Sequence, residues 1–389
     1  MEKDHQIKIA IVTHQMVMGG IEKSLVELCK ALITNGMHVT LYLEAMGGDL
    51  FDEIPKEVHT VSIFKDYGSM AGIMRKSLCR GDLSAILSAV KARENTLHDG
   101  DPVRGWEYVC GYMQRGKEVF DYAFAYGAPV AFSTVYVDKI IRAKKKFAWI
   151  HNDPTQLSLD IRKYKYLFQP YDKIVCVSKE ARKTLLNMFP DFQNKTEVFY
   201  NIINKNALSK KAEQPVADMA FSGTKLLTVG RLCSPKGQDI IPRITRHLLD
   251  SGYDIRWYCI GEGDSRENIE SLIKEYGVES SVILLGNQNN PYPYFKRADI
   301  YIQPSRHEGF GITLTEAKIF ALPIITTDFD GAAEQITHEE TGIIVRFDED
   351  EIYHAIVELL EDQARRMKYK ENLRRDKKSC VSKLEDLLR

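Results

Sequence analysis

The sequence predicts an α/β protein built from two doubly wound lobes, each with a parallel sheet that is covered by helices on both faces. Short runs of β-branched and aliphatic residues alternate with patterns of helical periodicity, and this alternation occurs twice along the chain. The runs are apolar at consecutive positions, which is typical of strands buried on both faces. Because crossovers between parallel strands are right-handed, each succession is expected to wind into a Rossmann-like lobe.

The first half of the chain contains one clear helix pattern, over residues 22–35. A mostly helical, charged segment, 64–118, interrupts this half and indicates an insertion. The strands predicted for this half are 7–13, 38–44, 122–127, 146–150, 174–178 and 197–200.

The second half repeats the alternation after a polar stretch, 201–224, which lacks periodicity and is interpreted as a linker. The predicted domains are therefore a first lobe over 1–205, a second lobe over 206–365 and a C-terminal helix over 366–389 that packs back on the first lobe. The strands predicted for the second half are 225–230, 256–261, 282–286, 300–304, 324–327 and 342–345. The helices predicted there are 239–251, 264–276, 313–320 and 350–361.

The composition indicates a globular protein that does not bind nucleic acid. The 389 residues are 44% hydrophobic and 28% charged, and the net charge is −1. Seven scattered cysteines form no CxxC pair, which favours free thiols in a reducing compartment over a zinc site or a disulfide framework. The charged N-terminus is unlike a signal peptide, and no window reaches the ~18 apolar residues of a membrane span. We therefore expect a cytoplasmic protein.

Two cations follow the first strand of the second lobe, where ligands bind in doubly wound folds. Arg231 and Lys236 lie after Gly230, in a loop that contains a proline and Gly237. An arginine offers a planar fork to phosphate oxygens and a lysine offers a movable point charge, so the pair suits a nucleoside diphosphate. Two solvated surface cations are the alternative interpretation.

The segment PSRHEGFGITLTEA, residues 304–317, carries two glutamates and two glycines at the end of another strand. Gly309 and Gly311 allow a tight turn and a close approach of the backbone to a ligand. The following helix presents unpaired amides and the positive end of its dipole to an anion. Glu316 lies about one turn inside this helix, about 5 to 6 Å from its start, which suits the ribose of a nucleotide whose phosphate sits there. Glu308 lies before the turn, on the sugar side.

A helix-capping interpretation competes for the same segment. Thr313 precedes Glu316 by three residues, and Ser305 precedes Glu308 by three, so both pairs match a capping box. Capping alone does not account for two glycines, two glutamates and a cationic loop at the ends of strands in one sheet.

Other strand ends carry weaker signals. Gly261 begins an incomplete dinucleotide fingerprint, because Arg266 occupies the position of its last glycine. Asn287 lies in a polar loop that either faces a nucleobase or forms an ordinary turn. In the first lobe, Gly19 and Gly20 open a helix after the first strand, where they leave room for a ligand.

His151 follows the strand 146–150 and begins the polar cluster His-Asn-Asp-Pro. A histidine at a strand end can donate to sugar hydroxyls or to a leaving phosphate. A loop residue without a role is the alternative.

Together, these residues resemble the retaining glycosyltransferases of family 4, which have the two-lobed GT-B fold with a cleft between the lobes. The resemblance covers nearly the whole chain and is strongest over 225–345. The family's pair of glutamates separated by seven residues corresponds to Glu308 and Glu316, and its phosphate-binding cations correspond to Arg231 and Lys236. In the first lobe, the family's glycine pair and histidine correspond to Gly19, Gly20 and His151.

The resemblance implies roles for these positions. Arg231 and Lys236 would hold the donor diphosphate and stabilise it as it leaves, Glu316 would bind the ribose, and Glu308 would bind hydroxyls of the transferred sugar. The catalytic residues predicted are His151, Arg231, Lys236 and Glu308. The donor-binding residues predicted are Gly19, Gly20, Gly230, Arg231, Lys236, Gly261, Asn287, Glu308, Gly309, Phe310, Gly311, Ile312 and Glu316.

The implied reaction is a metal-independent, front-face transfer with retained configuration, with a nucleotide sugar as co-substrate and no cofactor. On family frequency the donor is expected to be a UDP-sugar. The acceptor is expected to be a glycan or a lipid-linked molecule in cell-surface polysaccharide biosynthesis. An epimerase or hydrolase of the same fold, or a non-catalytic partner subunit, is the alternative.

A basic stretch suggests a peripheral contact of the first lobe with the inner face of the cell membrane. Five cations lie within residues 139–146, and three more lie within 162–165. Such patches hold a protein against anionic headgroups. A solvated cationic face is the alternative.

Overall fold

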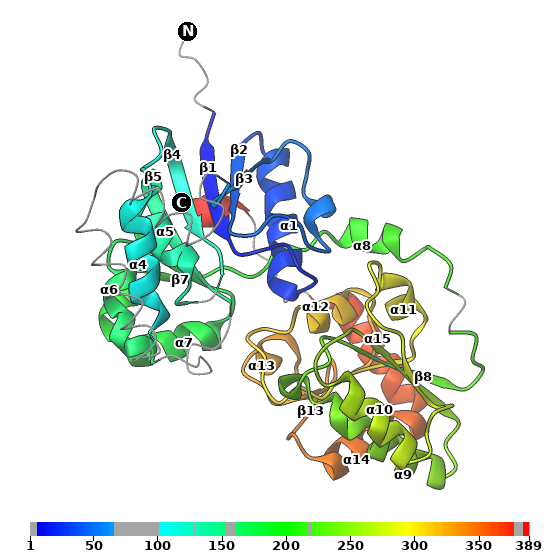
Figure 1. The fold of residues 1–389 in the computed structure, drawn as a ribbon. Coiled ribbons are helices and arrows are strands. Elements are labelled where there is room, and N and C mark those ends of the chain that lie inside the picture. The colour runs from blue at the N-terminus through cyan, green and yellow to red at the C-terminus, as the bar shows by residue number, and fades with distance from the viewer. Residues whose placement is uncertain are drawn as a thin grey trace. The chain divides into compact units, whose positions relative to one another are not determined.

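The computed structural model describes residues 6–65, 101–127, 129–151, 160–216, 219–376 and 384–388. The chain divides into two compact units, which Figure 1 shows as separate α/β bodies. Unit 1 comprises Met1–Ile202 and Ser382–Arg389, and unit 2 comprises Ile203–Val381. Each unit contains one sheet whose strands are all paired in parallel, which confirms the predicted fold class.

The sheet of unit 1 has the strand order β3-β2-β1-β4-β5-β6-β7. Its strands are β1 (Lys8–Thr13), β2 (His38–Leu43), β3 (His59–Ser62), β4 (Val119–Ala125), β5 (Arg142–Ile150), β6 (Lys173–Cys176) and β7 (Thr196–Val198). Its first helices are α1 (Gly20–Thr34), α4 (Pro102–Tyr112) and α5 (Phe132–Lys139). Further helices are α6 (Lys165–Phe168) and α7 (Lys179–Met188), with short 3-10 turns η1 (Phe51–Glu53), η3 (Ile161–Tyr164) and η4 (Pro190–Lys195).

Strand β3 was not predicted from the sequence. It is only four residues long, it lies at the sheet edge, and none of its residues is fully buried. His59, Thr60 and Ser62 therefore interrupt the apolar run that identified the other strands. The insertion predicted over 64–118 contains α4, while residues 66–100 lie outside the described part of the chain.

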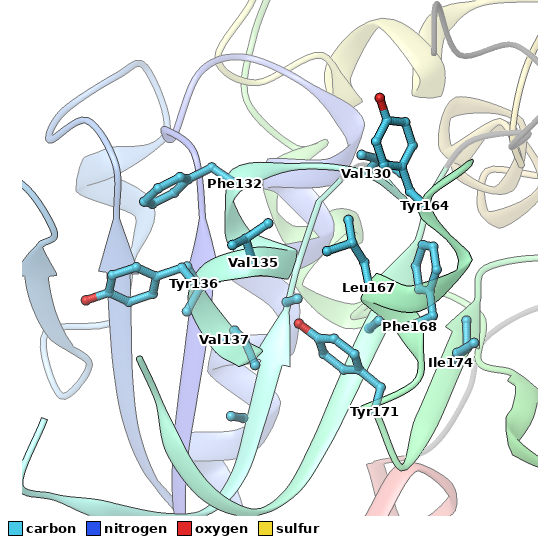
Figure 2. Close-up of a cluster of buried hydrophobic side chains, with 14 of the residues drawn as sticks. Val130, Phe132, Val135, Tyr136, Val137, Tyr164, Leu167, Phe168, Tyr171 and Ile174 are labelled. Carbon is cyan, nitrogen blue, oxygen red and sulfur yellow. The ribbon is translucent and has the colours of Figure 1, made fainter. Parts of the chain in front are cut away.

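Apolar side chains of α5 and α6 pack together on the sheet of unit 1 (Figure 2). Phe132 and Tyr136 of α5 lie in this core with Phe168 of α6. Tyr171, just before β6, donates its buried hydroxyl to the backbone carbonyl of Thr134 at 2.6 Å. The polar end of this tyrosine is thereby satisfied inside an apolar core.

The sheet of unit 2 has the strand order β10-β9-β8-β11-β12-β13. Its strands are β8 (Thr224–Val229), β9 (Ile255–Ile260), β10 (Val282–Leu284), β11 (Ile300–Gln303), β12 (Ile324–Thr327) and β13 (Ile343–Val345). Its first helices and turns are α8 (Lys205–Lys211), η5 (Ser234–Lys236), η6 (Gln238–Ile240), α9 (Ile241–Asp250) and α10 (Arg266–Glu275). The later helices are α11 (Tyr292–Arg297), α12 (Ile312–Ile319), α13 (Ala332–Gln335), α14 (Glu349–Glu361) and α15 (Gln363–Arg375).

This sheet is buried on both faces. Trp257 and Tyr258 are neighbours in β9, and both are fully buried, but they belong to two different hydrophobic clusters. Successive side chains of a strand point to opposite faces, so one cluster lies on each side of the sheet. The consecutive apolar residues that predicted these strands are explained by this double burial.

Two connecting segments differ from their predicted form. The stretch 201–224, interpreted as a linker, contains α8, whose Leu208 is buried in a core cluster of unit 2. The C-terminal stretch forms two helices in the described residues, α15 in unit 2 and α16 (Leu384–Leu388), which belongs with unit 1. Tyr122 of β4 donates its hydroxyl to the carbonyl of Leu388 at 3.2 Å, so the last helix packs on the first unit as predicted. Across the described residues, no helix is both long and apolar enough to cross a membrane.

The strand order reverses between β1 and β4 in unit 1 and between β8 and β11 in unit 2. Ligands of doubly wound sheets bind beyond the carboxyl ends of the strands at such a switch point. The loops after β8 and β11 contain Arg231, Lys236 and Glu308. The fold therefore brings the predicted cationic and acidic loops to the position where a ligand is expected.

Candidate functional site

The loops after β8 and β11 are bonded to each other through their backbones. The amides of Arg306 and His307 both donate to the carbonyl of Pro235, at 2.8 and 3.1 Å. Gly237 adopts the left-handed conformation with φ 69°, and a β-carbon there would collide with the carbonyl oxygen of Pro304. The close approach of the two loops therefore depends on a glycine at position 237.

Lys236 and Glu308 meet where these loops join. The Lys236 ammonium forms an ion pair with Oε1 of Glu308, and both side chains are mostly shielded, with 26% and 12% exposed. Glu308 also accepts hydrogen bonds from Gln303 Nε2 at 3.0 Å and from Ser305 Oγ at 3.3 Å. The Ser305–Glu308 pair is not a capping box, because no helix begins there.

The buried side chain of Gln238 holds the backbone at Gly230 and Arg231, just after β8. This side chain is only 2% exposed, and its Nε2 donates to the carbonyls of Gly230 and Arg231 at 3.2 and 3.1 Å. Gly261 has φ 138°, and a β-carbon there would collide with the Gly230 carbonyl. Arg231 itself is exposed, so its guanidinium is accessible to solvent while its backbone is held by Gln238.

Helix α12 begins directly after the glycine-rich turn. Its N-cap is Gly311, in the left-handed conformation with φ 78°, and within the described residues no side chain caps its first amides. Thr313 lies inside the helix and donates its hydroxyl to Gln303 at 3.2 Å. The capping-box interpretation of Thr313 and Glu316 is therefore wrong. Uncapped first-turn amides, beginning at Ile312, are suited to an anion.

The turn before α12 is held by Gln335, a residue that the sequence did not indicate. Its Nε2 donates to the carbonyls of Phe310 and Gly311, and its Oε1 accepts the hydroxyl of Thr315 at 2.6 Å. Gln335 is 1% exposed. Because both carbonyls are occupied on the buried side, the peptide planes of the turn are fixed. Gln335 follows Gly311 by 24 residues, and only the fold places them together.

Glu316 lies on α12 and is almost completely buried, with 3% of its surface exposed. Its Oε1 accepts the hydroxyl of Tyr292 from α11 at 3.1 Å. The Tyr292 ring stacks on Phe320 with centroids 6.2 Å apart, which restricts where the hydroxyl can lie.

Asn287 follows β10 beside Gly286, whose carbonyl accepts the Gly261 amide at 2.9 Å. Asn287 thus lies at the same edge of the sheet.

The predicted residues of unit 1 form a second group. Gly19 precedes α1 in extended backbone, and Ser24 donates its hydroxyl to the Gly20 carbonyl at 2.8 Å. Ser24 is also hydrogen-bonded to the side chain of Tyr126, whose ring packs on His151 with centroids 4.4 Å apart. The start of α1 is thereby connected to His151. Residues 152–159, including the Asn-Asp of the predicted polar cluster, lie outside the described part of the chain.

Burial lowers the pKa of His151 to about 3, so its ring is neutral at physiological pH. Its Nε2 is buried and has no hydrogen-bond partner within the described residues. A neutral imidazole offers one donor and one acceptor nitrogen. His151 can therefore exchange a hydrogen bond with a hydroxyl, but it carries no charge to offer a phosphate.

His151 should make the stability of the protein depend on pH. The folded pKa lies below the ordinary value near 6.5, so the stabilisation is complete above about pH 6.5 and is lost as the pH falls toward 3. We expect the free energy of unfolding to fall by about 1.4 kcal/mol per pH unit in this window because of this one group. Urea unfolding at pH 7, 6 and 5 measures the slope, which His151→Gln should reduce. His59→Gln, which alters an exposed histidine of the same unit, is the matched control, and an equal effect of both substitutions would contradict the assignment.

The basic stretch 139–146 lies at the start of β5, whereas His151 follows its end. Nine residues of strand span roughly 30 Å, so Arg142 at the start of β5 lies far from the edge of the sheet that carries His151. Two of the lysines are paired, Lys144 with Asp121 at 2.7 Å and Lys139 with Asp138 at 2.9 Å. Arg142 and Lys145 are exposed there.

Residues 218–376 match the model of the family described as glycosyl transferases group 1. A related sequence from Campylobacter jejuni is N-acetylgalactosamine-N,N'-diacetylbacillosaminyl-diphospho-undecaprenol 4-alpha-N-acetylgalactosaminyltransferase. It is 31% identical over 206 residues, which cover 52% of this chain and 55% of that protein. The capsular polysaccharide biosynthesis glycosyltransferase CapM of Staphylococcus aureus is 25% identical over 192 residues, with 49% of each chain covered. The chain spans about half the length of the curated relatives it matches.

Solved structures resemble the whole chain in fold. HepE of Anabaena, crystallised with UDP and glucose, has a TM-score of 0.71 at 16% identity and covers 95% of this chain and 94% of its own. A mutant of TarM from Staphylococcus aureus, in complex with Fondaparinux, alpha-GlcNAc-glycerol and UDP, has a TM-score of 0.72 at 13% identity. That match covers 98% of this chain and 99% of TarM. These likenesses establish a two-unit GT-B fold.

Proposed function

We propose that the chain is a glycosyltransferase that uses a nucleotide-diphosphate sugar, because residues 218–376 match the model of glycosyl transferases group 1. The observation that carries the proposal is the contact between Lys236 and Glu308 at the switch point of unit 2. This contact brings a cation that suits phosphate oxygens next to a carboxylate that suits sugar hydroxyls. Arg231 and the uncapped start of α12 lie at the ends of the same two strands.

The donor we propose is a UDP-sugar whose diphosphate lies against Arg231, Lys236 and the first amides of α12. Glu316 would accept hydrogen bonds from the ribose, one helical turn further along α12. HepE and TarM were both crystallised with UDP, which supports a uridine nucleotide here. Glu308 would accept hydrogen bonds from hydroxyls of the transferred sugar.

The chemistry we propose is a front-face displacement with retained configuration. The bond between the anomeric carbon and the diphosphate oxygen breaks while an acceptor oxygen bonds to the same face of that carbon. The acceptor proton passes to the departing phosphate oxygen, so no additional base is consumed. Negative charge grows on the diphosphate, where Arg231 and Lys236 stabilise it. Proton NMR of the first product formed distinguishes retention from inversion, and an inverted anomer would contradict the mechanism.

Metal independence is part of the proposal, because the two cations supply the charge that a divalent ion would otherwise supply. We expect about 5 to 10 mM EDTA to leave the initial rate within about twofold, since transition-state charge is stabilised by fixed side chains. The rate is measured with and without added Mg²⁺ or Mn²⁺ after dialysis. A loss of activity on chelation that is restored by one of these ions would refute this part of the mechanism.

The function is tested by thermal stabilisation with UDP and a panel of UDP-sugars, followed by product analysis. A ligand at about 100 times its dissociation constant contributes about 2.7 kcal/mol of stability, which gives a measurable shift in Tm. Sugar turnover that requires an added glycan supports transfer. Turnover at the same rate without any acceptor would favour an epimerase or hydrolase instead. Absence of nucleotide binding would favour a non-catalytic partner subunit.

We propose a glycan or lipid-linked acceptor in cell-surface polysaccharide biosynthesis, and a cytoplasmic protein that contacts the membrane through unit 1. The undecaprenol-linked and capsular names of two relatives support this acceptor class. Arg142 and Lys145 are two exposed cations of the stretch 139–146, and Arg162 and Lys163 of the second basic group are exposed as well. Cosedimentation with phosphatidylglycerol vesicles should fall when all four are changed to glutamate, and unchanged binding would contradict the membrane contact.

A further inference from the structure

Arg306 lies two residues before Glu308, and its side chain is hydrogen-bonded to the loop that carries Lys236. Its guanidinium donates two parallel hydrogen bonds to Asp239, from Nη1 to Oδ1 and from Nη2 to Oδ2, both at 2.7 Å. The same Nη1 donates to the carbonyl of Ser234 at 2.7 Å. The guanidinium carbon lies over the Phe347 ring, 4.3 Å from its centroid. This set of contacts fixes the position and the orientation of the fork.

The contacts of Arg306 enclose the turn that presents Lys236. Ser234–Lys236 is a single 3-10 turn, in which the Gly237 amide donates to Ser234 at 3.2 Å and the Lys236 amide donates to Cys233 at 2.9 Å. Arg306 bonds to the start of this turn through Ser234 and to the segment just after it through Asp239. Its own backbone amide bonds to the middle of the turn, at Pro235.

Arg306 and Asp239 form an ion pair in which both side chains are charged. Burial raises the pKa of Asp239, but the hydrogen bonds and charge of Arg306 outweigh burial and hold that pKa below its usual value. Both side chains are about one third exposed, so solvent screens the attraction and the gain in global stability is modest. The pair therefore matters more for the position of the Lys236 loop than for global stability. Its two parallel hydrogen bonds fix both the distance and the relative plane of the Arg306 and Asp239 side chains.

We propose that Arg306 is a positioning residue that fixes the Lys236 turn against the Glu308 loop, and so sets where the Lys236 ammonium meets the donor phosphates. The inference rests on the proposed function, since it concerns the same donor site. Arg306 acts through Lys236 and does not touch the donor. A lysine at position 306 keeps the charge but cannot make the bidentate bond, so it should not restore the position of the turn.

The test is a double-mutant cycle between Arg306→Ala and Lys236→Ala, read as kcat/KM for the donor and as affinity for UDP. We expect Arg306→Ala to lower kcat/KM about tenfold in the wild-type background, because a misplaced catalytic group loses effectiveness steeply with distance. In the Lys236→Ala background the same substitution should change kcat/KM by less than about twofold, because the group that it positions is gone. Asp239→Asn should reproduce the effect of Arg306→Ala, and Arg306→Lys should recover less than half of it.

Arg246→Ala is the matched control, since Arg246 forms an exposed ion pair with Asp250 within α9 of the same unit. It should leave kcat/KM and UDP affinity unchanged. Equal losses from Arg306→Ala in both Lys236 backgrounds, or no loss in the wild-type background, would overturn the positioning role while the proposed function stands. Full activity of Lys236→Ala would refute the role of Lys236 on which this inference rests. Failure of the wild-type protein to bind UDP or to turn over a UDP-sugar would instead overturn the proposed function, so the failures are distinguishable.

Discussion

Replacing Lys236 by alanine is expected to lower kcat about 10²- to 10³-fold, which is the usual cost of removing one group that stabilises developing negative charge. The substitution removes the cation that contacts Glu308 and, in the proposed reaction, the leaving diphosphate. Initial rates at saturating UDP-sugar measure the loss. The effect should appear mainly in kcat, because the charge on the diphosphate grows as the glycosidic bond breaks.

The fold should tolerate this substitution. Glu308 keeps its hydrogen bonds from Gln303 and Ser305, so its carboxylate is not left without a donor. The matched control is Lys225→Ala, which removes a lysine paired with Asp299 at 3.3 Å at the amino end of β8, away from the site. Lys225→Ala should keep full kcat. Near-wild-type turnover of Lys236→Ala, or equal losses in both variants, would refute the role of Lys236.

The strands of unit 2 were predictable because burial on both faces leaves a continuous apolar run in the sequence. β12 has the predicted bounds, 324–327, since all four of its residues are buried. Strand β3 escaped prediction because an edge strand needs no such run. Helix α8 escaped it because the helix is only seven residues long and buries a single residue, Leu208. Short elements are stabilised by their partners in the fold, and partners far along the chain leave no local pattern.

The loop residues at the strand ends could be predicted from the sequence, whereas the side chains that support these loops could not. Parallel strands deliver their carboxyl ends to one edge, so the strand pattern alone predicts that the loops of Lys236 and Glu308 lie at the same edge of the sheet. Gln238, Gln335 and Arg306 support these loops through contacts with residues 7 to 72 positions away. A buried glutamine or a paired arginine looks in the sequence like any surface polar residue. The supporting contacts therefore appear only in the structure.

The roles of two glycines differ in how well the sequence predicts them. The motif suggested that Gly309 and Gly311 both serve the turn, and Gly311 is the one with a left-handed backbone. Gly237 of the cationic loop is required because the Pro304 carbonyl occupies the place of a β-carbon. The sequence alone does not show that the backbone of another loop lies against Gly237. This close approach of the two loops is what brings Lys236 to Glu308.

Replacing Glu316 by alanine is expected to weaken UDP binding about 10- to 100-fold, because hydrogen bonds to a buried charged group contribute about 1.5 to 3 kcal/mol. The alternative, that Glu316 only caps a helix, is not available, since α12 begins at Ile312 with Gly311 as its N-cap. Calorimetry with UDP measures the loss. Tyr292→Phe is the matched control: it removes the hydroxyl that donates to Glu316 at 3.1 Å but keeps the carboxylate and the stacked ring. This control should weaken UDP binding much less than Glu316→Ala does, because the carboxylate that would accept the ribose hydroxyls is kept.

A second ligand shows whether Glu316 acts on the ribose. The wild-type protein should bind UDP more tightly than 2′,3′-dideoxyuridine diphosphate, which lacks the hydroxyls that a carboxylate would accept. In Glu316→Ala the two nucleotides should bind equally, because the acceptor of those hydroxyls is gone. Lys236→Ala should preserve the difference, since its target is the diphosphate. If Glu316→Ala still discriminated between the two nucleotides, the ribose would be recognised by another residue, and the division of labour between Glu316 and Lys236 would be wrong.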